Sequence, residues 1–72
     1  MKLIQIHTPY IKLDAALKYS GVCTLGSDAK ARIAAGEIKV NGETCTMRGK
    51  KLKPGDTIEV DGVLYEVAAD TL

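Results

Sequence analysis

Hydrophobic positions in the first half of the chain pass from a strand-like to a helix-like period. Residues 3–6 have the alternating character of a short strand, and Pro9 lacks the backbone donor that would be needed to continue it. From Leu13 onward the apolar residues recur three and four positions apart, which predicts a short helix that ends near Gly21. Residues 27–36 are rich in alanine, carry an acid near the start and end in glycine, so they predict a second helix.

After the second helix the period changes to two. Residues 38–41 place apolar side chains on one face of a strand and Lys39 on the opposite, outward face. Asn41-Gly42 favours a tight type I′ turn. We therefore expect this strand to form a hairpin with residues 43–46.

A second hairpin is expected further along the chain. Residues 57–60 and 63–67 are typical of strands, and the Asp61-Gly62 pair between them favours a tight turn. The segment 47–53 that precedes this hairpin is predicted to be a basic loop with one apolar anchor, Leu52, followed by a Pro-Gly-Asp turn. Two short helices followed by a small, mainly antiparallel sheet indicate an α+β domain.

The composition is that of one small folded domain. The 72 residues contain 46% hydrophobic and 26% charged residues, which excludes a disordered tail, and no linker or repeat divides them. A single domain over residues 1–72 is therefore expected, and nothing in the sequence demands more than a monomer. No apolar run approaches the roughly 18–20 residues that cross a membrane, so no membrane partner is expected. With only two cysteines, Cys23 and Cys45, a cytoplasmic location is expected.

The net charge of +1 conceals an asymmetry along the chain. Residues 29–53 contain seven basic and two acidic side chains, whereas residues 54–72 contain five acidic side chains and no basic one. A basic middle segment favours a polyanionic partner, because lysine and arginine neutralise phosphates and release counterions. Its bases are Lys30, Arg32, Lys39, Arg48, Lys50, Lys51 and Lys53.

Side chains suited to catalysis or metal binding are few. His7 is the only histidine, the acids are not set at a metal-binding spacing, and Gly49-Lys50 lacks the flanking residues of a phosphate loop. We therefore predict no enzyme activity, no metal site and no cofactor. A thiol function of Cys23 or Cys45 would require an activating neighbour that the sequence does not place.

One ordered set of residues spans most of the chain. Its members are Leu13-Asp14, Leu17, Gly21, Ala29-Lys30, Ile33, Gly36, Val40-Asn41-Gly42, Pro54-Gly55-Asp56 and Ile58. This order resembles the S4 RNA-binding domain over about residues 11–60, and the Gly-x-Ile-x-Val-Asn-Gly stretch with the later Pro-Gly-Asp is its most specific part. Because no catalytic domain is attached, the sequence is most similar to the small standalone S4 proteins of the YaaA/YbcJ kind.

The resemblance implies an αL motif, in which two helices pack against a small sheet and structured RNA lies across the second helix and the strand-loop surface. One departure is that many S4 domains open the second helix with Ser-Arg, where this sequence has Leu25-Gly26. The helix cap is then expected to come from Thr24 or Ser27. Taken with the charge pattern, the resemblance nominates as RNA-binding residues Lys12, Lys30, Arg32, Lys39, Asn41, Arg48, Lys50, Lys51 and Lys53.

The sequence therefore predicts a non-catalytic module that recognises structured RNA, ribosomal or tRNA-like, through its shape and its phosphates. The alternative is a protein-interaction module whose basic face docks an acidic partner.

Overall fold

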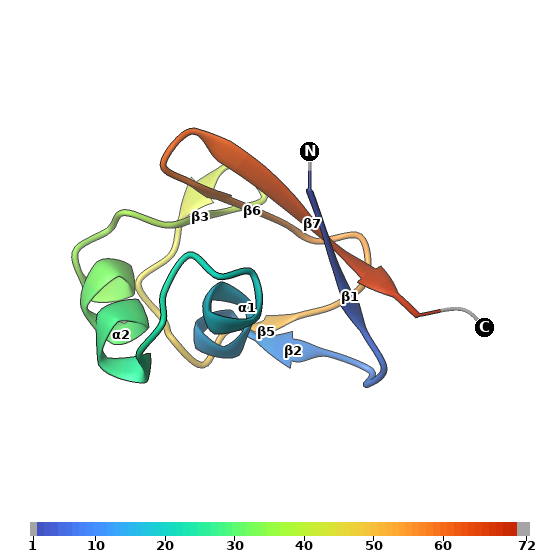
Figure 1. Cartoon of the computed structure of the whole chain (residues 1–72). Coiled ribbons are helices and arrows are strands. Elements are labelled where there is room, and N and C mark those ends of the chain that lie inside the picture. The colour runs from blue at the N-terminus through green and yellow to red at the C-terminus, as the bar shows by residue number, and fades with distance from the viewer. Residues whose placement is uncertain (1, 71–72) are drawn as a thin grey trace.

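Two helices lie against one face of a five-stranded sheet (Figure 1). The computed structural model describes residues 2–70. Two short helices with a mainly antiparallel sheet confirm the predicted α+β class. The elements are β1 (Lys2–Ile6), β2 (Ile11–Lys12), α1 (Leu13–Tyr19), α2 (Gly26–Ala34), β3 (Lys39–Val40), β4 (Glu43–Thr44), β5 (Lys51–Leu52), β6 (Thr57–Val60) and β7 (Val63–Ala69).

The larger sheet joins the first and last strands of the described range. Its strand order is β1-β7-β6-β3-β4, and β1 and β7 pair in parallel whereas the other pairs are antiparallel. The register sets Ile4 beside Val67, and both side chains are buried. The backbone N–H of Asp70 donates to the carbonyl of Ile6 at 2.9 Å and extends this pairing beyond the end of β7. The two strands most distant in sequence are therefore neighbours at one edge of the sheet.

Both predicted hairpin turns are present. The φ angles are 53° at Asn41 and 54° at Asp61, and the glycine after each also has a positive φ. Two successive residues in the left-handed region fit a type I′ turn, which is the reason that Asn-Gly and Asp-Gly pairs favour it. β4 ends at Thr44, two residues earlier than predicted, although the N–H of Cys45 still donates to the carbonyl of Ile38 at 2.9 Å.

A second, two-stranded sheet was not predicted. β2 and β5 pair antiparallel, with Ile11 opposite Leu52 and Lys12 opposite Lys51. The prediction that Leu52 anchors its segment is confirmed, because the side chain is fully buried. The prediction that residues 47–53 form a loop throughout is wrong at its end, where Lys51 and Leu52 form a strand. This β2–β5 ribbon lies beside α1 (Figure 1).

The core lies between the helices and the larger sheet. The first helix contributes the apolar stripe that the sequence predicted, including Leu13 and Leu17, and α2 contributes Ile33, each of them at most 1% exposed. Cys23 belongs to the same core at 3% exposure, as a free thiol that acts as a small apolar side chain. The largest fully buried side chains are Ile4, Leu13, Leu17, Ile33, Ile38, Leu52, Ile58, Val60 and Val67.

Glycines end both helices as predicted. Ser20 follows the last turn of α1, and Gly21 then takes a φ of 83°. Ala35 follows the last turn of α2, and Gly36 takes a φ of 77°. A left-handed residue at this point turns the chain away from the helix axis, and glycine adopts that conformation without steric cost. Neither helix of residues 2–70 is long and apolar enough to cross a membrane.

The start of α2 differs from the prediction. The helix begins at Gly26, so Leu25 is the N-cap residue, and no side chain caps the helix. The prediction of a cap from Thr24 or Ser27 is therefore wrong. The carbonyl of Leu25 accepts the N–H groups of Asp28 at 3.1 Å and Ala29 at 3.2 Å, so backbone alone closes the first turn.

Candidate nucleic-acid interface

Four basic side chains gather where the β2–β5 ribbon meets the start of α1. Lys12 and Lys51 are directly opposite each other in the ribbon. Arg48 and Lys50 lie in the turn that leads into β5, and their carbonyls contact the first residues of α1. We call these four residues the ribbon cluster: Lys12, Arg48, Lys50 and Lys51.

Two backbone hydrogen bonds fasten the turn of the ribbon cluster to the helix. The N–H of Leu13 donates to the carbonyl of Lys50 at 2.9 Å, and the N–H of Asp14 donates to the carbonyl of Arg48 at 3.2 Å. Both donors belong to the first turn of α1, where a helix has no internal acceptor for them. The turn therefore completes the helix, and the helix in return fixes where the basic residues stand.

The side chains of the ribbon cluster form no ion pairs within the described part of the chain, although the N–H of Lys53 and, more weakly, the nearby charge of Lys50 lower the pKa of Asp56. All four side chains are exposed, and none of them forms an ion pair within residues 2–70. Like charges set directly opposite each other on two strands destabilise the pairing. This arrangement does not help the fold, and it concentrates positive charge on the surface.

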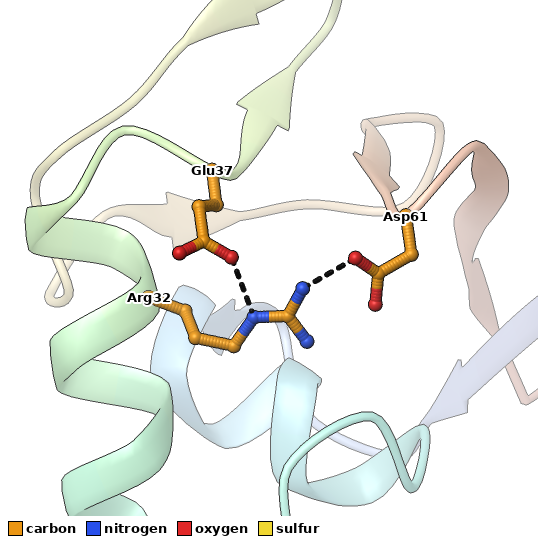
Figure 2. Close-up of polar contacts among 3 residues, drawn as sticks. All are labelled: Arg32, Glu37 and Asp61. Atoms are coloured by element: carbon orange, nitrogen blue, oxygen red, sulfur yellow. Dashed lines mark hydrogen bonds and ion pairs between the residues drawn. The ribbon is translucent and has the colours of Figure 1, made fainter.

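Arg32 has a different environment from the ribbon cluster. Figure 2 shows its guanidinium between two carboxylates, with Nε donating to Oε1 of Glu37 at 3.0 Å and Nη2 donating to Oδ1 of Asp61 at 2.5 Å. The hydrogen bond to Asp61 and then that to Glu37 raise the pKa of Arg32 above its ordinary value. Arg32 thus joins α2 to the turn between β6 and β7, and its Nε and Nη2 donate within the fold.

Asn41 also has partners within the protein. Its Nδ2 donates to Oδ1 of Asp56 at 3.2 Å, and its Oδ1 accepts the backbone N–H of Thr57 at 2.9 Å. The other carboxylate oxygen of Asp56 accepts the N–H of Lys53 at 2.7 Å. The N–H of Lys53, the amide of Asn41 and the nearby charge of Lys50 lower the pKa of Asp56 against the opposing effect of burial. These bonds fix the chain on both sides of the ribbon cluster.

The remaining predicted site residues lie around the ribbon cluster or away from it. Lys53 is exposed immediately after β5, and Lys30 is exposed on α2, beside Ala29, which is buried. Lys39 is exposed on β3 between two buried neighbours, so its side chain is on the face of the sheet opposite to the helices, as predicted. Its register partner Glu59 belongs to that same outer face. The structure thus brings together Lys12 and the residues of segment 48–53, and it separates Lys39 from them.

One aromatic residue at this site was missed in the sequence. Tyr10 precedes β2 and is 38% exposed, and Nζ of Lys51 lies 4.9 Å from the centre of its ring. The contact depends on the pairing of β2 with β5. Because each strand has only two residues, no periodic pattern predicted it.

The histidine and the two thiols considered for catalysis or metal binding lie outside the ribbon cluster. His7 is exposed, and its Nδ1 lies 2.8 Å from Oδ2 of Asp70. Cys45 is half-buried and is a free thiol like Cys23. Within residues 2–70, no three His, Cys, Asp or Glu side chains are grouped so that they could hold a metal ion.

Comparison with known proteins gives concordant matches. Residues 4–68 match the S4 domain family. The chain is 39% identical over 59 residues to the "Probable ribosome maturation protein RlbA" of Bacillus subtilis, which covers 82% of this chain and 83% of the relative. It is 34% identical over 61 residues to the "Putative RNA-binding protein YbcJ" of Escherichia coli, which covers 85% of this chain and 87% of the relative.

The fold is also that of a solved relative. The solution structure of YbcJ from Escherichia coli, described as revealing an ALFAL motif involved in RNA binding, superposes with a TM-score of 0.73 at 31% identity. The superposition covers 96% of this chain and 89% of that structure. A family match across residues 4–68 and relatives above 30% identity over more than four fifths of the sequence show that this chain belongs to the S4 domain family.

Proposed function

We propose that this domain binds structured RNA, and that the ribbon cluster is the centre of the binding surface. Lys53 and the exposed Lys30 of α2 extend the surface to either side. Arg32 and Asn41 support the fold next to this surface, and Lys39 lies outside it. The proposal needs no catalytic group, cofactor or metal.

The observation that carries the proposal is that the four side chains of the ribbon cluster are exposed and that none forms an ion pair within residues 2–70. Lys12 faces Lys51 directly, and Arg48 and Lys50 are held beside them by the backbone of α1. Four cations on backbone segments that are joined to one another match the closely spaced phosphates of a nucleic acid better than they match a single acidic side chain. Arg48 adds a planar fork of donors that binds phosphate oxygens in pairs.

Structured RNA fits this surface better than a single strand does. The deep groove of an RNA double helix hides its bases, so proteins recognise such helices by shape and by backbone contacts. Cations whose backbone is held by a ribbon and a helix suit that mode of recognition. The names of the relatives support the same ligand, since one is named a putative RNA-binding protein and the other a probable ribosome maturation protein. The second name favours ribosomal RNA over a tRNA-like ligand.

Fluorescence anisotropy tests the proposal. The probes are an RNA hairpin from a ribosomal helix, a DNA duplex of the same sequence and an unpaired strand, each titrated at 50 mM and 200 mM salt. We expect preference for the hairpin, and about four phosphate contacts predict roughly a hundredfold loss of its affinity between the two salt concentrations. Weak binding to all three probes with no salt dependence would overturn the proposal and favour an acidic protein as the partner.

A charge-matched pair of variants locates the surface. Reversal of Arg48, Lys50 and Lys51 to glutamate should abolish hairpin binding while circular dichroism stays that of the folded protein. Reversal of Lys2, Lys18 and Lys39 changes the net charge by the same amount outside the ribbon cluster and should leave most of the affinity. An equal loss in both variants would show that overall charge, and not this surface, determines binding.

A further inference from the structure

The edge of the ribbon cluster carries an exposed aromatic ring under a cation. Tyr10 directly precedes β2, and Lys51 stands on β5 opposite Lys12. The ammonium group of Lys51 lies 4.9 Å from the centre of the Tyr10 ring, while 38% of the tyrosine surface stays open to solvent. The ring is therefore both accessible and adjacent to the charges that are proposed to meet phosphate.

The other two tyrosines do not combine these properties. Tyr65 is buried in the core at 7% exposure. Tyr19 is 63% exposed but ends α1, the opposite end of the helix from the ribbon. Within residues 2–70, the pair of Tyr10 and Lys51 is the cation–ring contact that the structure records. Tyr10 is thus distinguished by position, and Tyr19 provides a matched comparison.

The Tyr10 ring can exchange its present partner for a nucleobase. An exposed cation over a tyrosine changes an equilibrium constant by only a few-fold. A base stacked on an aromatic side chain contributes about fivefold to a hundredfold. A base that reaches the ring can therefore displace the ammonium group, and Lys51 is then free to bind the phosphate of the same nucleotide.

We propose that Tyr10 and Lys51 together bind one unpaired nucleotide of the RNA, with the base stacked on Tyr10 and its phosphate bound by Lys51. This inference rests on the proposed function and adds the class of RNA element that the surface selects. Bases inside a double helix are not accessible to an aromatic side chain, whereas bases in bulges and loops are. The preferred ligand is then a helix interrupted by an unpaired nucleotide, so that the ribbon cluster meets the helix and Tyr10 meets the interruption.

Two blunt-ended RNA duplexes of the same sequence test this inference. One is fully paired, and the other has a single unpaired nucleotide in one strand. We expect the native protein to bind the bulged duplex at least fivefold more tightly. Tyr10→Leu should remove this preference and leave the bulged duplex bound no more tightly than the paired one, whereas Tyr10→Phe and the matched control Tyr19→Leu should retain the preference.

A second measurement uses the unaltered protein, so it does not depend on the folding of any variant. With 5-iodouridine at the unpaired position, irradiation should crosslink the base to Tyr10, which mass spectrometry of the digested complex identifies. Equal binding of both duplexes by the native protein, or a crosslink at Tyr19 in place of Tyr10, would overturn the inference while the proposed function stands. Failure of the native protein to bind either duplex would overturn the proposed function itself.

Discussion

The side chain of Asn41 donates to the carboxylate of Asp56, fifteen positions further along the chain, over 3.2 Å. The same side chain accepts the backbone N–H of Thr57, so both ends of the amide are used. The Val-Asn-Gly stretch and the Pro-Gly-Asp turn carry much of the family resemblance. In the structure they are joined by the hydrogen bond between Asn41 and Asp56. Their role in the fold is to fix both ends of the segment that carries Arg48, Lys50 and Lys51.

The amide of Asn41 is expected to stabilise the domain separately from its backbone conformation. Asn41→Gly keeps a residue that accepts the φ of 53° and removes the side-chain bonds to Asp56 and Thr57. We expect a loss of about 1 kcal/mol in the free energy of unfolding in urea. Asn41→Ala should cost about 1 kcal/mol more than Asn41→Gly, because alanine has neither the conformational freedom of glycine nor the polar side chain that lets asparagine adopt the left-handed region. Equal stability of Asn41→Gly and the native protein would show that these bonds contribute nothing.

The lowered pKa of Asp56 predicts an acid-sensitive part of the stability. Because the folded-state pKa lies below that of the unfolded chain, the contribution is complete above the ordinary aspartate pKa of about 4 and is lost as the pH falls through the folded value. The principal cause is the N–H of Lys53, followed among the stabilising contacts by the amide of Asn41. Asp56→Asn should therefore be less stable than the native protein at pH 7, and the difference should shrink steadily below pH 4. A difference that stays constant across this range contradicts the assignment.

Arg32 is expected to affect stability more than RNA affinity. Arg32→Gln removes both ion pairs in Figure 2 and should lower the thermal midpoint. If the contact with Asp61 is the main one, Asp61→Asn should lower the midpoint much less in the Arg32→Gln background than in the native protein. The dissociation constant for the RNA hairpin should change less than twofold at a temperature where the variant is folded. A loss of affinity equal to that of Lys51→Gln would instead place Arg32 in the RNA interface.

Local patterns in the sequence predicted the elements that depend on neighbouring residues. The two hairpin turns follow from Asn41-Gly42 and Asp61-Gly62, because these pairs accept the left-handed backbone that a type I′ turn requires. The buried face of α2 follows from the spacing of Ala29 and Ile33, both of which are fully buried. The exposure of Lys39 follows from the alternation along its strand.

Contacts between distant segments were not predictable in the same way. The parallel pairing of β1 with β7 depends on the closure of the whole domain, and the β2–β5 ribbon has only two residues in each strand. Arg32 was predicted to bind RNA, but its carboxylate partner Asp61 is 29 positions away. The basic composition of segment 47–53 therefore predicts a polyanionic ligand, whereas the tertiary structure shows which basic side chains have acidic partners within the fold.

Burial of Leu52 is expected to couple the stability of the domain to its proposed binding surface. The side chain is fully buried and belongs to the strand that positions Lys51. Leu52→Ala should cost about 3 kcal/mol in the free energy of unfolding. Met47→Ala, a truncation in the same segment at a side chain that is 66% exposed, should cost less than about 0.5 kcal/mol. Equal losses in urea denaturation would show that Leu52 does not anchor the segment.

The opposed pair of Lys12 and Lys51 predicts that a change which raises the stability of the domain lowers its affinity for RNA. Because the two cations face each other on paired strands, Lys12→Gln should relieve repulsion and raise the free energy of unfolding by a few tenths of a kcal/mol. The same change removes one phosphate contact, so the slope of log affinity against log salt should become shallower by about 1. Lys39→Gln, on the opposite face of the sheet, should leave the slope unchanged. Parallel urea and salt titrations measure both quantities. If the slope became shallower in Lys39→Gln and stayed unchanged in Lys12→Gln, the interface would lie on the outer face of the sheet.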